Sequence, residues 1–590
     1  MDRSGRTGGP GGRRVLRVGN ASGFYGDRRA AFREMVTGGP LDVVTGDYLA
    51  ELTMLILARD RVKDPGLGYA RTFLGQLEEC LGEVVDRGLR VVVNAGGLNP
   101  GRLAEAVGEL AAKAGVAVPV GYVAGDDLLG RAEELGLPGG LLAAHAYLGA
   151  FGIAECLRGG AQVVVTGRVT DAALVVGPAI AHFGWGEKDL DALAGAVVAG
   201  HVLECGAQAT GGNYAFFAEH DLRRPGFPIA EIEADGSSVI TKHPGTGGAV
   251  TTETVTAQLL YETGPARYAG PDVTARLDSV RLRQEGPDRV RISGVRGEAP
   301  PPTLKVGLNR LGGWRNEVTF VLTGLEIEAK AELVRTQVAA ALDPAPAELR
   351  WTLARTDHPD AATEETASAL LHLAVRDADQ RVVGKAVSAA AVELGLASYP
   401  GFHLTGLPGP GTPYGVFEAA YVPAGAVEHT AVLPDGTRKV IQEASVTREL
   451  VAAEQPELPE PLAEGPRRRA PLGLVAGARS GDKGGDANLG VWARNETGWR
   501  WLAHELTVER VKELLPEAAE LAVERQLLPH LRAVNFTVHG LLGWGVAAQE
   551  RFDPQAKALG EWLRARQVEI PETVLAAAEQ AVAQAPEEAR

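Results

Sequence analysis

Short apolar runs alternate with amphipathic segments over the first part of the chain. Runs rich in Val and Leu occupy residues 15–18, 41–45, 89–93 and 162–166. Segments with the spacing of helices occupy residues 28–35, 48–59, 71–87, 102–114 and 145–158. Because continuous β-branched runs that alternate with helices are typical of a mostly parallel sheet with both faces covered, we predict an α/β domain over residues 14–268. The pattern fits an open sheet and a β/α barrel equally well.

The hydrophobic pattern changes after this domain. Strand patterns occupy residues 273–283, 289–295, 317–325, 349–354, 416–422 and 428–433, and helical patterns occupy 328–342 and 384–394. This mixture predicts an α+β middle region over residues 269–453, which we expect to pack on the first domain.

A proline-rich stretch precedes the last part of the chain. Residues 454–471 carry five prolines and seven charged residues, a composition that predicts an extended linker. After it, residues 472–570 predict a small α+β domain. Its elements are a strand, a long loop at 478–490, a second strand, helices at 508–515 and 518–528, a strand at 533–538 and a helix at 554–566.

Composition narrows the possible partners. A net charge of −16 argues against nucleic acid. No apolar run reaches the roughly 18 residues that a membrane helix needs, and residues 1–13 lack the apolar segment of a secretory signal. The three cysteines are too scattered for a disulfide framework or a Cys-only zinc site. We therefore expect a cytoplasmic protein with no nucleic-acid or membrane partner.

Polar clusters follow four of the predicted strands. They lie at residues 19–23, 45–48, 94–97 and 166–171. Since the carboxyl ends of parallel strands meet at one edge of a sheet, we expect these clusters to converge on a ligand site. Glycine lets the backbone approach a ligand, and helix amino termini favour anions. A purely structural role as caps and turns is the alternative for each cluster taken singly.

Three glycine-rich stretches carry further candidates, at residues 204–214, 242–250 and 478–490. The first suits a loop over an active site, and the second places Lys and His beside a predicted helix start. The third brings two acidic and two basic side chains together. No dinucleotide fingerprint, Walker motif or zinc-ligand spacing occurs, so we predict no standard cofactor, while Mg²⁺ stays open.

The motifs RVGNASGFYGDR, VTGDYLAELTM, VNAGGLNP, VTGRVTDAAL, LECGAQATGGN and KHPGTGGAV resemble the acyclic terpene utilisation (AtuA-like) family of bacteria. ARSGDKGGDANLGVWAR and FDPQAKALGEWL resemble the C-terminal domain that accompanies that family. The resemblance implies a ferredoxin-like C-terminal domain and a part in the breakdown of citronellol- and geraniol-type compounds through acyl-CoA intermediates. It implies no list of catalytic residues.

These observations lead to one main hypothesis and two alternatives. We expect a homo-oligomeric enzyme that acts on a small acid or its CoA thioester by hydration, dehydration or carbon–carbon cleavage. The alternatives are a non-catalytic binding or scaffold subunit of a catabolic complex and a divalent-metal hydrolase. The candidate catalytic residues are Asp47, Glu51, Asp171 and His243. The candidate ligand-binding residues are Asn20, Ser22, Asn94, Arg168, Gly211, Asn213, Lys242, Thr246, Arg479, Asp482, Lys483, Asp486 and Asn488.

Overall fold

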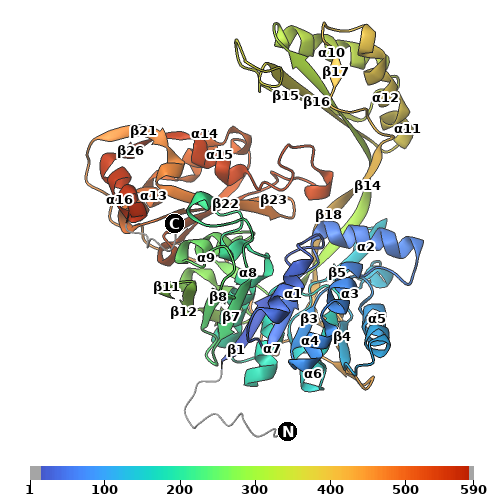
Figure 1. Ribbon diagram of the computed structural model, residues 1–590, viewed down its shortest axis with the longest axis vertical. Helices are drawn as coiled ribbons and strands as arrows, with labels where there is room; N and C mark the ends of the chain where they lie inside the picture. The colour runs from blue at the N-terminus through green and yellow to red at the C-terminus, as the bar shows by residue number, and fades with distance from the viewer. Residues whose placement is uncertain (1–14, 584–590) are drawn as a thin grey trace. The chain divides into compact units, whose positions relative to one another are not determined.

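The computed structural model describes residues 15–583, which form two compact units (Figure 1). The first unit contains the described residues up to Asn309, together with Phe417–Val546 and the residues from Gln555 onward. The second contains Arg310–Val416 and Ala547–Pro554. Residues 1–13, for which the sequence predicts no secretory signal, lie outside the described range.

An 11-stranded mixed sheet forms the centre of the first unit. Five parallel strands lie side by side in the order β1 (Leu16–Asn20), β2 (Val43–Gly46), β3 (Arg90–Val93), β6 (Val163–Thr166) and β4 (Val120–Ala124). Antiparallel strands extend both sides: β7 (Pro228–Ile232), β8 (Ser238–Lys242), β12 (Arg289–Ser293) and β11 (Arg281–Gly286) beyond β1, and β19 (Thr430–Val432) and β20 (Arg438–Val440) beyond β4. The α/β prediction is confirmed, and because β11 and β20 are separate ends, the sheet is open rather than a barrel.

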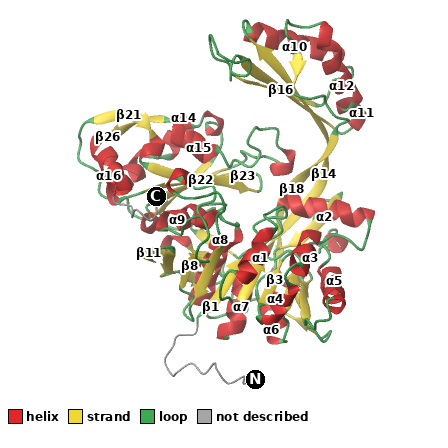
Figure 2. Ribbon diagram, in the orientation of Figure 1, coloured by secondary structure: helices red, strands yellow, loops and turns green. Residues whose placement is uncertain are grey.

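Helices cover both faces of the parallel strands (Figure 2). Val91, Val93, Val163 and Val165 pack with one helix set, whereas Val92 and Val164 pack with the other, as the two-residue period of a strand requires. The first set is α1 (Ala30–Thr37), α3 (Arg71–Glu78), α4 (Leu81–Asp86) and α5 (Pro100–Lys113). The second is α6 (Phe151–Arg158), α7 (Ala173–Phe183) and α8 (Leu190–Glu204). Further elements of the unit are α2 (Glu51–Lys63), α9 (Thr252–Leu259), β5 (Leu141–Ala146), β9 (Arg267–Ala269), β10 (Thr274–Arg276) and β13 (Arg296–Glu298).

The last part of the first unit is a small α+β layer structure. Its four-stranded sheet has the order β22 (Ala476–Lys483), β23 (Asp486–Ala493), β25 (Ala533–Val538) and β24 (Val523–Leu528). The helices α13 (Glu496–Glu505), α14 (Val508–Leu514), α15 (Leu559–Ala565) and α16 (Glu572–Ala583) accompany it, and β21 (Arg467–Pro471) pairs with β26 (Gln567–Pro571).

Two glycines let this small sheet lie directly on the α/β domain. A Cβ on Gly481 would lie 2.4 Å from the Tyr261 ring, and a Cβ on Gly490 would lie 2.4 Å from Leu260 Cβ. Trp492 stacks on Tyr214 with ring centroids 6.2 Å apart, and Arg494 forms ion pairs with Glu219 and Glu253. These contacts hold the β22–β23 hairpin in place against α9 and the loop that follows it.

The second unit is built on an antiparallel sheet. β16 (Ser368–Asp377) lies between β15 (Glu348–Ala354) and β14 (Thr303–Thr323), and β17 (His403–Leu404) pairs with β14. The helices are α10 (Ile327–Ala341), α11 (Gln380–Val383) and α12 (Lys385–Val392). Side chains of α10 and α12 pack with Phe320, Leu371 and Leu373 in one core. The strands β14 and β18 (Thr412–Pro423) carry residues of both units.

Four local predictions are wrong. Residues 478–490 form most of a β-hairpin instead of a long loop, because only Gly484 and Gly485 lie between its strands. The helix predicted at 145–158 begins only at Phe151, since residues 141–146 pair with β14. The helix predicted at 71–87 breaks between Glu78 and Leu81. Most of the helix predicted at 518–528 is β24, which pairs with β25.

Within residues 15–583, no helix has both the length and the apolar character needed to cross a membrane.

Candidate functional site

Polar residues at the carboxyl ends of β2 and β3 contact one another directly. Asn94 donates a hydrogen bond from its amide nitrogen to Asp47 Oδ1 and accepts one from the Tyr48 backbone N–H at 2.7 Å. The same Asp47 oxygen accepts the Leu49 backbone N–H at 3.0 Å. Asp47 and Asn94 are both buried. The predicted convergence of strand-end clusters therefore occurs here, and these bonds fix the orientation of the Asp47 carboxyl.

Arg168, which follows β6, joins this group. Its guanidinium lies 3.0 Å from the Asp171 carboxylate, donates to the Leu49 carbonyl at 3.2 Å, and lies 4.2 Å from the centre of the Tyr147 ring. Its backbone N–H donates to Asp126, whose carboxylate also contacts His145 at 2.7 Å. Asp126 and His145 are both buried. The hydrogen bond from the Arg168 backbone to Asp126 fixes the turn that carries the Arg168 side chain.

The β22–β23 hairpin delivers Lys483 to the same place. Lys483 is the last residue of β22, and Gly484 after it has φ +63°, a conformation that favours glycine in a two-residue turn. The Lys483 ammonium lies 5.3 Å from the centre of the Tyr268 ring. It interacts electrostatically with Glu51, Glu204 and Glu262 of the α/β domain. The C-terminal domain thus contributes a cation to the strand-end group.

Three further charged residues interact with this group and were not predicted from the sequence: Glu204 at the end of α8, Glu262 after α9, and Lys305 near the start of β14. Lys305 lies 4.7 Å from the Tyr147 ring centre and interacts with Glu51 and Arg168. Glu262 has φ +54°, which is uncommon outside glycine. Only one signal pointed to Lys305, namely that lysine is rare here, with 11 residues in the chain. We call the whole group the charged cluster: Asp47, Glu51, Arg168, Asp171, Glu204, Glu262, Lys305, Asp482 and Lys483.

Burial raises the pKa values of several carboxyls in the charged cluster. Burial and then repulsion from Asp171 raise the pKa of Asp47 well above its ordinary value. The same two causes act on Glu204, whose pKa is also raised well above the ordinary value. Burial, followed by repulsion from Glu262 and Glu51, raises the pKa of Asp482 to about 8. Asp482 is therefore a carboxylic acid that holds its proton near neutral pH.

Glu51 behaves in the opposite way. Burial acts to raise its pKa, but the charges of Lys305, Arg168 and Lys483 outweigh it, so the pKa lies below the ordinary value. Burial acts to lower the pKa of Lys305, yet Tyr147 and Glu51 raise it overall. For Lys483, burial of the ammonium and repulsion from Lys305 lower the pKa. An ionised carboxylate, a carboxyl whose pKa is about 8 and three cations thus share one site, an arrangement suited to acid–base chemistry on an anion.

Other predicted residues surround the charged cluster or make structural contacts. Asn20 donates to the Leu203 carbonyl at 2.6 Å and so connects the end of β1 to the end of α8. Ser22 donates to the Phe24 carbonyl. Arg479 donates two hydrogen bonds to the Gln208 side chain, at 2.9 and 2.6 Å, and its guanidinium lies over the Tyr261 ring. Gly211 has φ +106°, which suits only glycine, and Asn213 is exposed.

Two residues of the hairpin are occupied by neighbours within the small domain. Asp486 contacts His539 Nδ1 at 2.9 Å and accepts the Gly540 backbone N–H. Asn488 donates to Asn535 at 2.6 Å, and Asn535 in turn donates to the Thr263 and Gly264 carbonyls. These contacts fix the shape of the hairpin and its packing on the α/β domain.

Lys242, His243 and Thr246 form a separate group at the end of β8. Lys242 forms an ion pair with Asp288 at 2.9 Å and donates to the Thr246 carbonyl at 2.7 Å. His243 Nε2 contacts the Met35 carbonyl at 3.0 Å, and burial lowers its pKa. Their loop lines a different cavity of about 600 Å³, together with Arg223 and Arg224. The structure does not bring these three residues into contact with the charged cluster.

Within residues 15–583, no three or more His, Cys, Asp or Glu side chains are arranged to hold a metal ion.

Comparison with known families gives two matches. The model of the acyclic terpene utilisation family protein AtuA matches residues 16–433, and the model of the AtuA ferredoxin-like domain matches residues 470–569. No curated protein and no solved structure matches the chain. The small domain that carries Lys483 is therefore ferredoxin-like, as the motifs predicted. Since the first match alone covers well over half of the chain, the protein belongs to the acyclic terpene utilisation family AtuA.

Proposed function

We propose that this protein is an enzyme that acts on a small carboxylic acid or its CoA thioester, by hydration, dehydration or carbon–carbon cleavage. Membership of the AtuA family supports involvement in acyclic terpene utilisation, and the substrate would be a citronellol- or geraniol-type or related branched acid. A cytoplasmic location and a homo-oligomeric state belong to the same proposal.

One observation carries the proposal: neighbouring carboxyls in the charged cluster have pKa values moved in opposite directions. Glu51 is held ionised beside Lys305 and Arg168, whereas burial raises the pKa of Glu204 and raises that of Asp482 to about 8, so that Asp482 keeps its proton near neutral pH. Pairs of titratable groups separated in this way serve as the base and the acid of a reaction. Cations beside them neutralise a substrate carboxylate or a developing enolate.

The roles follow from these charges. Arg168, Lys305 and Lys483 bind the anionic end of the substrate, and Asp47 with Asp171 holds Arg168. In a dehydration, Glu51 removes the proton next to the carbonyl, the carbon–oxygen bond breaks, and a protonated carboxyl such as Asp482 gives its proton to the departing hydroxyl. In a cleavage, Glu51 takes the proton of a 3-hydroxyl group, the carbon–carbon bond breaks, and the acid protonates the enolate.

The proposal is tested in two steps. A thermal-shift screen of free acids, acyl-CoAs and Mg²⁺ identifies the ligands that stabilise the full chain, because a ligand that binds the native state raises the melting temperature. Activity on responding compounds is then compared for the wild type and for Glu51→Gln and Asp482→Asn. The matched control is Glu109→Gln, an exposed acid on α5.

We expect both cluster variants to lose activity by about 10²-fold or more and the control to keep it. Unchanged activity in both cluster variants would exclude the assignment. A stable heteromeric partner with no response to any small molecule would support the non-catalytic subunit instead. Loss of activity on chelation, with recovery on adding metal, would support the divalent-metal hydrolase.

A further inference from the structure

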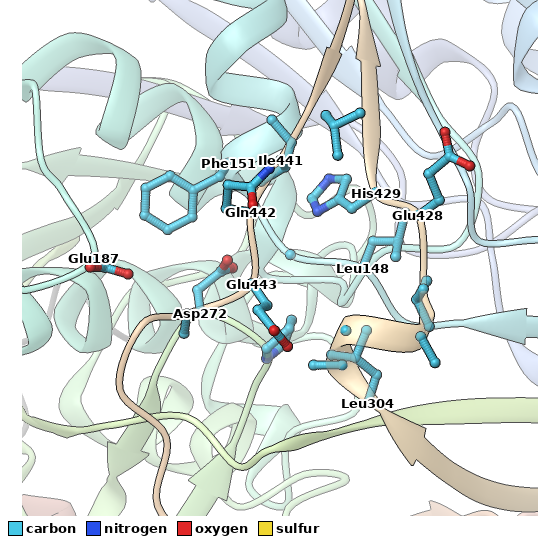
Figure 3. Close-up of a pocket in the computed structure, with 18 of the residues that line it drawn as sticks. Leu148, Phe151, Glu187, Asp272, Leu304, Glu428, His429, Ile441, Gln442 and Glu443 are labelled. Atoms are coloured by element: carbon cyan, nitrogen blue, oxygen red, sulfur yellow. The ribbon is translucent and has the colours of Figure 1, made fainter.

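A second cavity lies on the other side of two chain segments that line the charged cluster. The side chains of Tyr147 and Lys305 lie on the side of the charged cluster. Their chain neighbours Leu148 and Leu304 line a cavity of about 720 Å³ on the opposite side (Figure 3). The segments are paired, since the Tyr147 N–H donates to the Lys305 carbonyl at 2.9 Å. Neighbouring residues of an extended chain point to opposite sides. The cavity is therefore distinct from the candidate site, and its volume is typical of sites for small organic molecules.

The walls of this cavity combine apolar with polar and charged side chains. They come from the start of α6 and from the residues around β19 and β20, which are distant in sequence. Leu148, Phe151, Leu304, Val427 and Ile441 supply aliphatic and aromatic surface. Figure 3 shows the Asp272, Glu443 and His429 side chains around the same space. An apolar body with one polar group is the kind of ligand that such a lining suits.

The cations of the lining are already neutralised. Arg131 donates to Glu134 at 3.0 and 2.6 Å and to the Ala426 carbonyl at 2.7 Å. Lys439 lies 3.0 Å from the Glu155 carboxylate. Burial lowers the pKa of His429 to about 4, so this ring is neutral near pH 7. An anionic ligand would therefore find no free positive charge in the cavity.

Among the described residues, several acidic side chains of the lining have no cation as an ion-pair partner, and Asp272 and Glu443 are two of them. Within residues 15–583, neither Asp272 nor Glu443 has an ion-pair partner, and the hydrogen bond of Asp272 comes from the Ala150 backbone N–H at 2.8 Å. Burial raises the pKa of Asp272 to about 6, and no neighbouring cation opposes this effect. Asp272 is held close to the chain, because a Cβ on Gly149 would lie 2.2 Å from its Oδ1. His429 adds a buried ring nitrogen, Nε2, that has no hydrogen-bond partner among the described residues.

We propose that this cavity binds an aliphatic amine in its ammonium form, with the alkyl chain against Phe151, Leu148 and Leu304 and the ammonium at Asp272 and Glu443. A buried carboxylate gains most from a donor that is itself charged, and an aromatic ring such as Phe151 also attracts a cation. The amine supplies the positive charge that the lining lacks. Acids and acyl-CoAs, the proposed substrates of the charged cluster, are excluded by the same charges.

The test uses three probes that share one chain length: hexylamine, hexan-1-ol and hexanoate. Their binding to the full-length protein is measured by isothermal titration calorimetry near pH 7.5. We expect hexylamine to bind, hexan-1-ol to bind more weakly and hexanoate not to bind. Asp272→Asn and Glu443→Gln should each weaken hexylamine binding about tenfold, since each removes one charged hydrogen-bond acceptor. Glu109→Gln on α5 is the matched control and should bind like the wild type.

Asparagine can still accept the Ala150 N–H, and Glu443 is exposed, so both variants should fold, which circular dichroism checks. The proposal is overturned if hexanoate or hexan-1-ol binds as tightly as hexylamine, if no probe binds, or if both variants keep wild-type affinity. None of these measurements uses the charged cluster. A negative result would therefore leave the proposed function standing, and loss of that function would leave this site unaffected.

Discussion

Two pairs of neighbouring residues, Tyr147–Leu148 and Leu304–Lys305, separate two environments of opposite character. On one side, Arg168, Lys305 and Lys483 stand among carboxyls and suit an anion. On the other side, the cations Arg131 and Lys439 are neutralised by neighbours, and Asp272 has no cation beside it. The difference shows how the two-residue period of an extended chain lets one thin wall serve two sites with different charge preferences.

The largest effect is expected at Arg168 on the anion-binding side. Arg168→Lys keeps the charge but loses the planar guanidinium, whose Nη1 contacts both the Asp171 carboxylate and the Leu49 carbonyl. We expect kcat/KM on a responding acid or acyl-CoA to fall about 100-fold, because the substrate anion would be misplaced. Arg102→Lys, at an exposed position of α5, is the control. Equal activity of the two variants would remove Arg168 from the site.

A substitution of Lys483 tests whether the ferredoxin-like domain completes the charged cluster. Lys483→Met removes the cation that faces Glu51, Glu204 and Glu262. Activity should fall by roughly 30-fold, mainly through KM, since a charged contact with the substrate is lost. The exposed Lys113 gives the matched control, Lys113→Met. A wild-type KM in Lys483→Met would show that the hairpin serves only to pack the domains.

The close packing of the β22–β23 hairpin on the α/β domain can be tested by measuring the free energy of unfolding. Gly490→Ala places a Cβ 2.4 Å from Leu260 Cβ, and overpacking of this kind costs about 1–3 kcal/mol. Chemical denaturation should show this loss. Gly108→Ala in α5 meets no atom within 4 Å and should stabilise the protein by about 0.5–1 kcal/mol, because alanine favours helix. The same sign for both variants would contradict the close contact.

The pH dependence of activity tests Asp482 as the proton donor of the charged cluster. If Asp482 donates a proton, activity should fall as pH rises through about 8, where this carboxyl ionises. The decline should approach tenfold per pH unit. A pH profile of kcat in Asp482→Asn should lack this limb and stay low throughout. A limb that persists in the variant would assign the acid to another group.

The smallest effect concerns Asp272 in the amine cavity. Its pKa is raised in the folded protein to about 6 from an ordinary value of 3.8, so the folded state binds the proton more tightly than the unfolded state. Its contribution to the free energy of unfolding therefore falls as pH rises from about 4 to 6, by about 2 kcal/mol at most. Asp272→Asn should remove this slope when urea unfolding is followed across that range. An unchanged slope would show that the carboxyl is well solvated.

The sequence by itself determined the α/β class and the strand-end half of the site. Val91, Val92 and Val93 mark a strand buried on both faces, and in parallel strands the residues that follow must share one edge. Asp47, Asn94 and Arg168 therefore meet as predicted. The long motifs identified the family, because their order and length exceed what turns alone would require.

Only the tertiary structure decided the rest of the charged cluster. The run from Ala478 to Gly490 contains residues that disfavour regular structure, yet cross-strand pairing and the contact of Gly481 and Gly490 with the residues directly after α9 make it a hairpin. Glu262 and Lys305 lie in unremarkable local sequence and join the site through packing between distant segments. Their pKa values depend on burial and on charges far along the chain, and neither can be derived from local pattern.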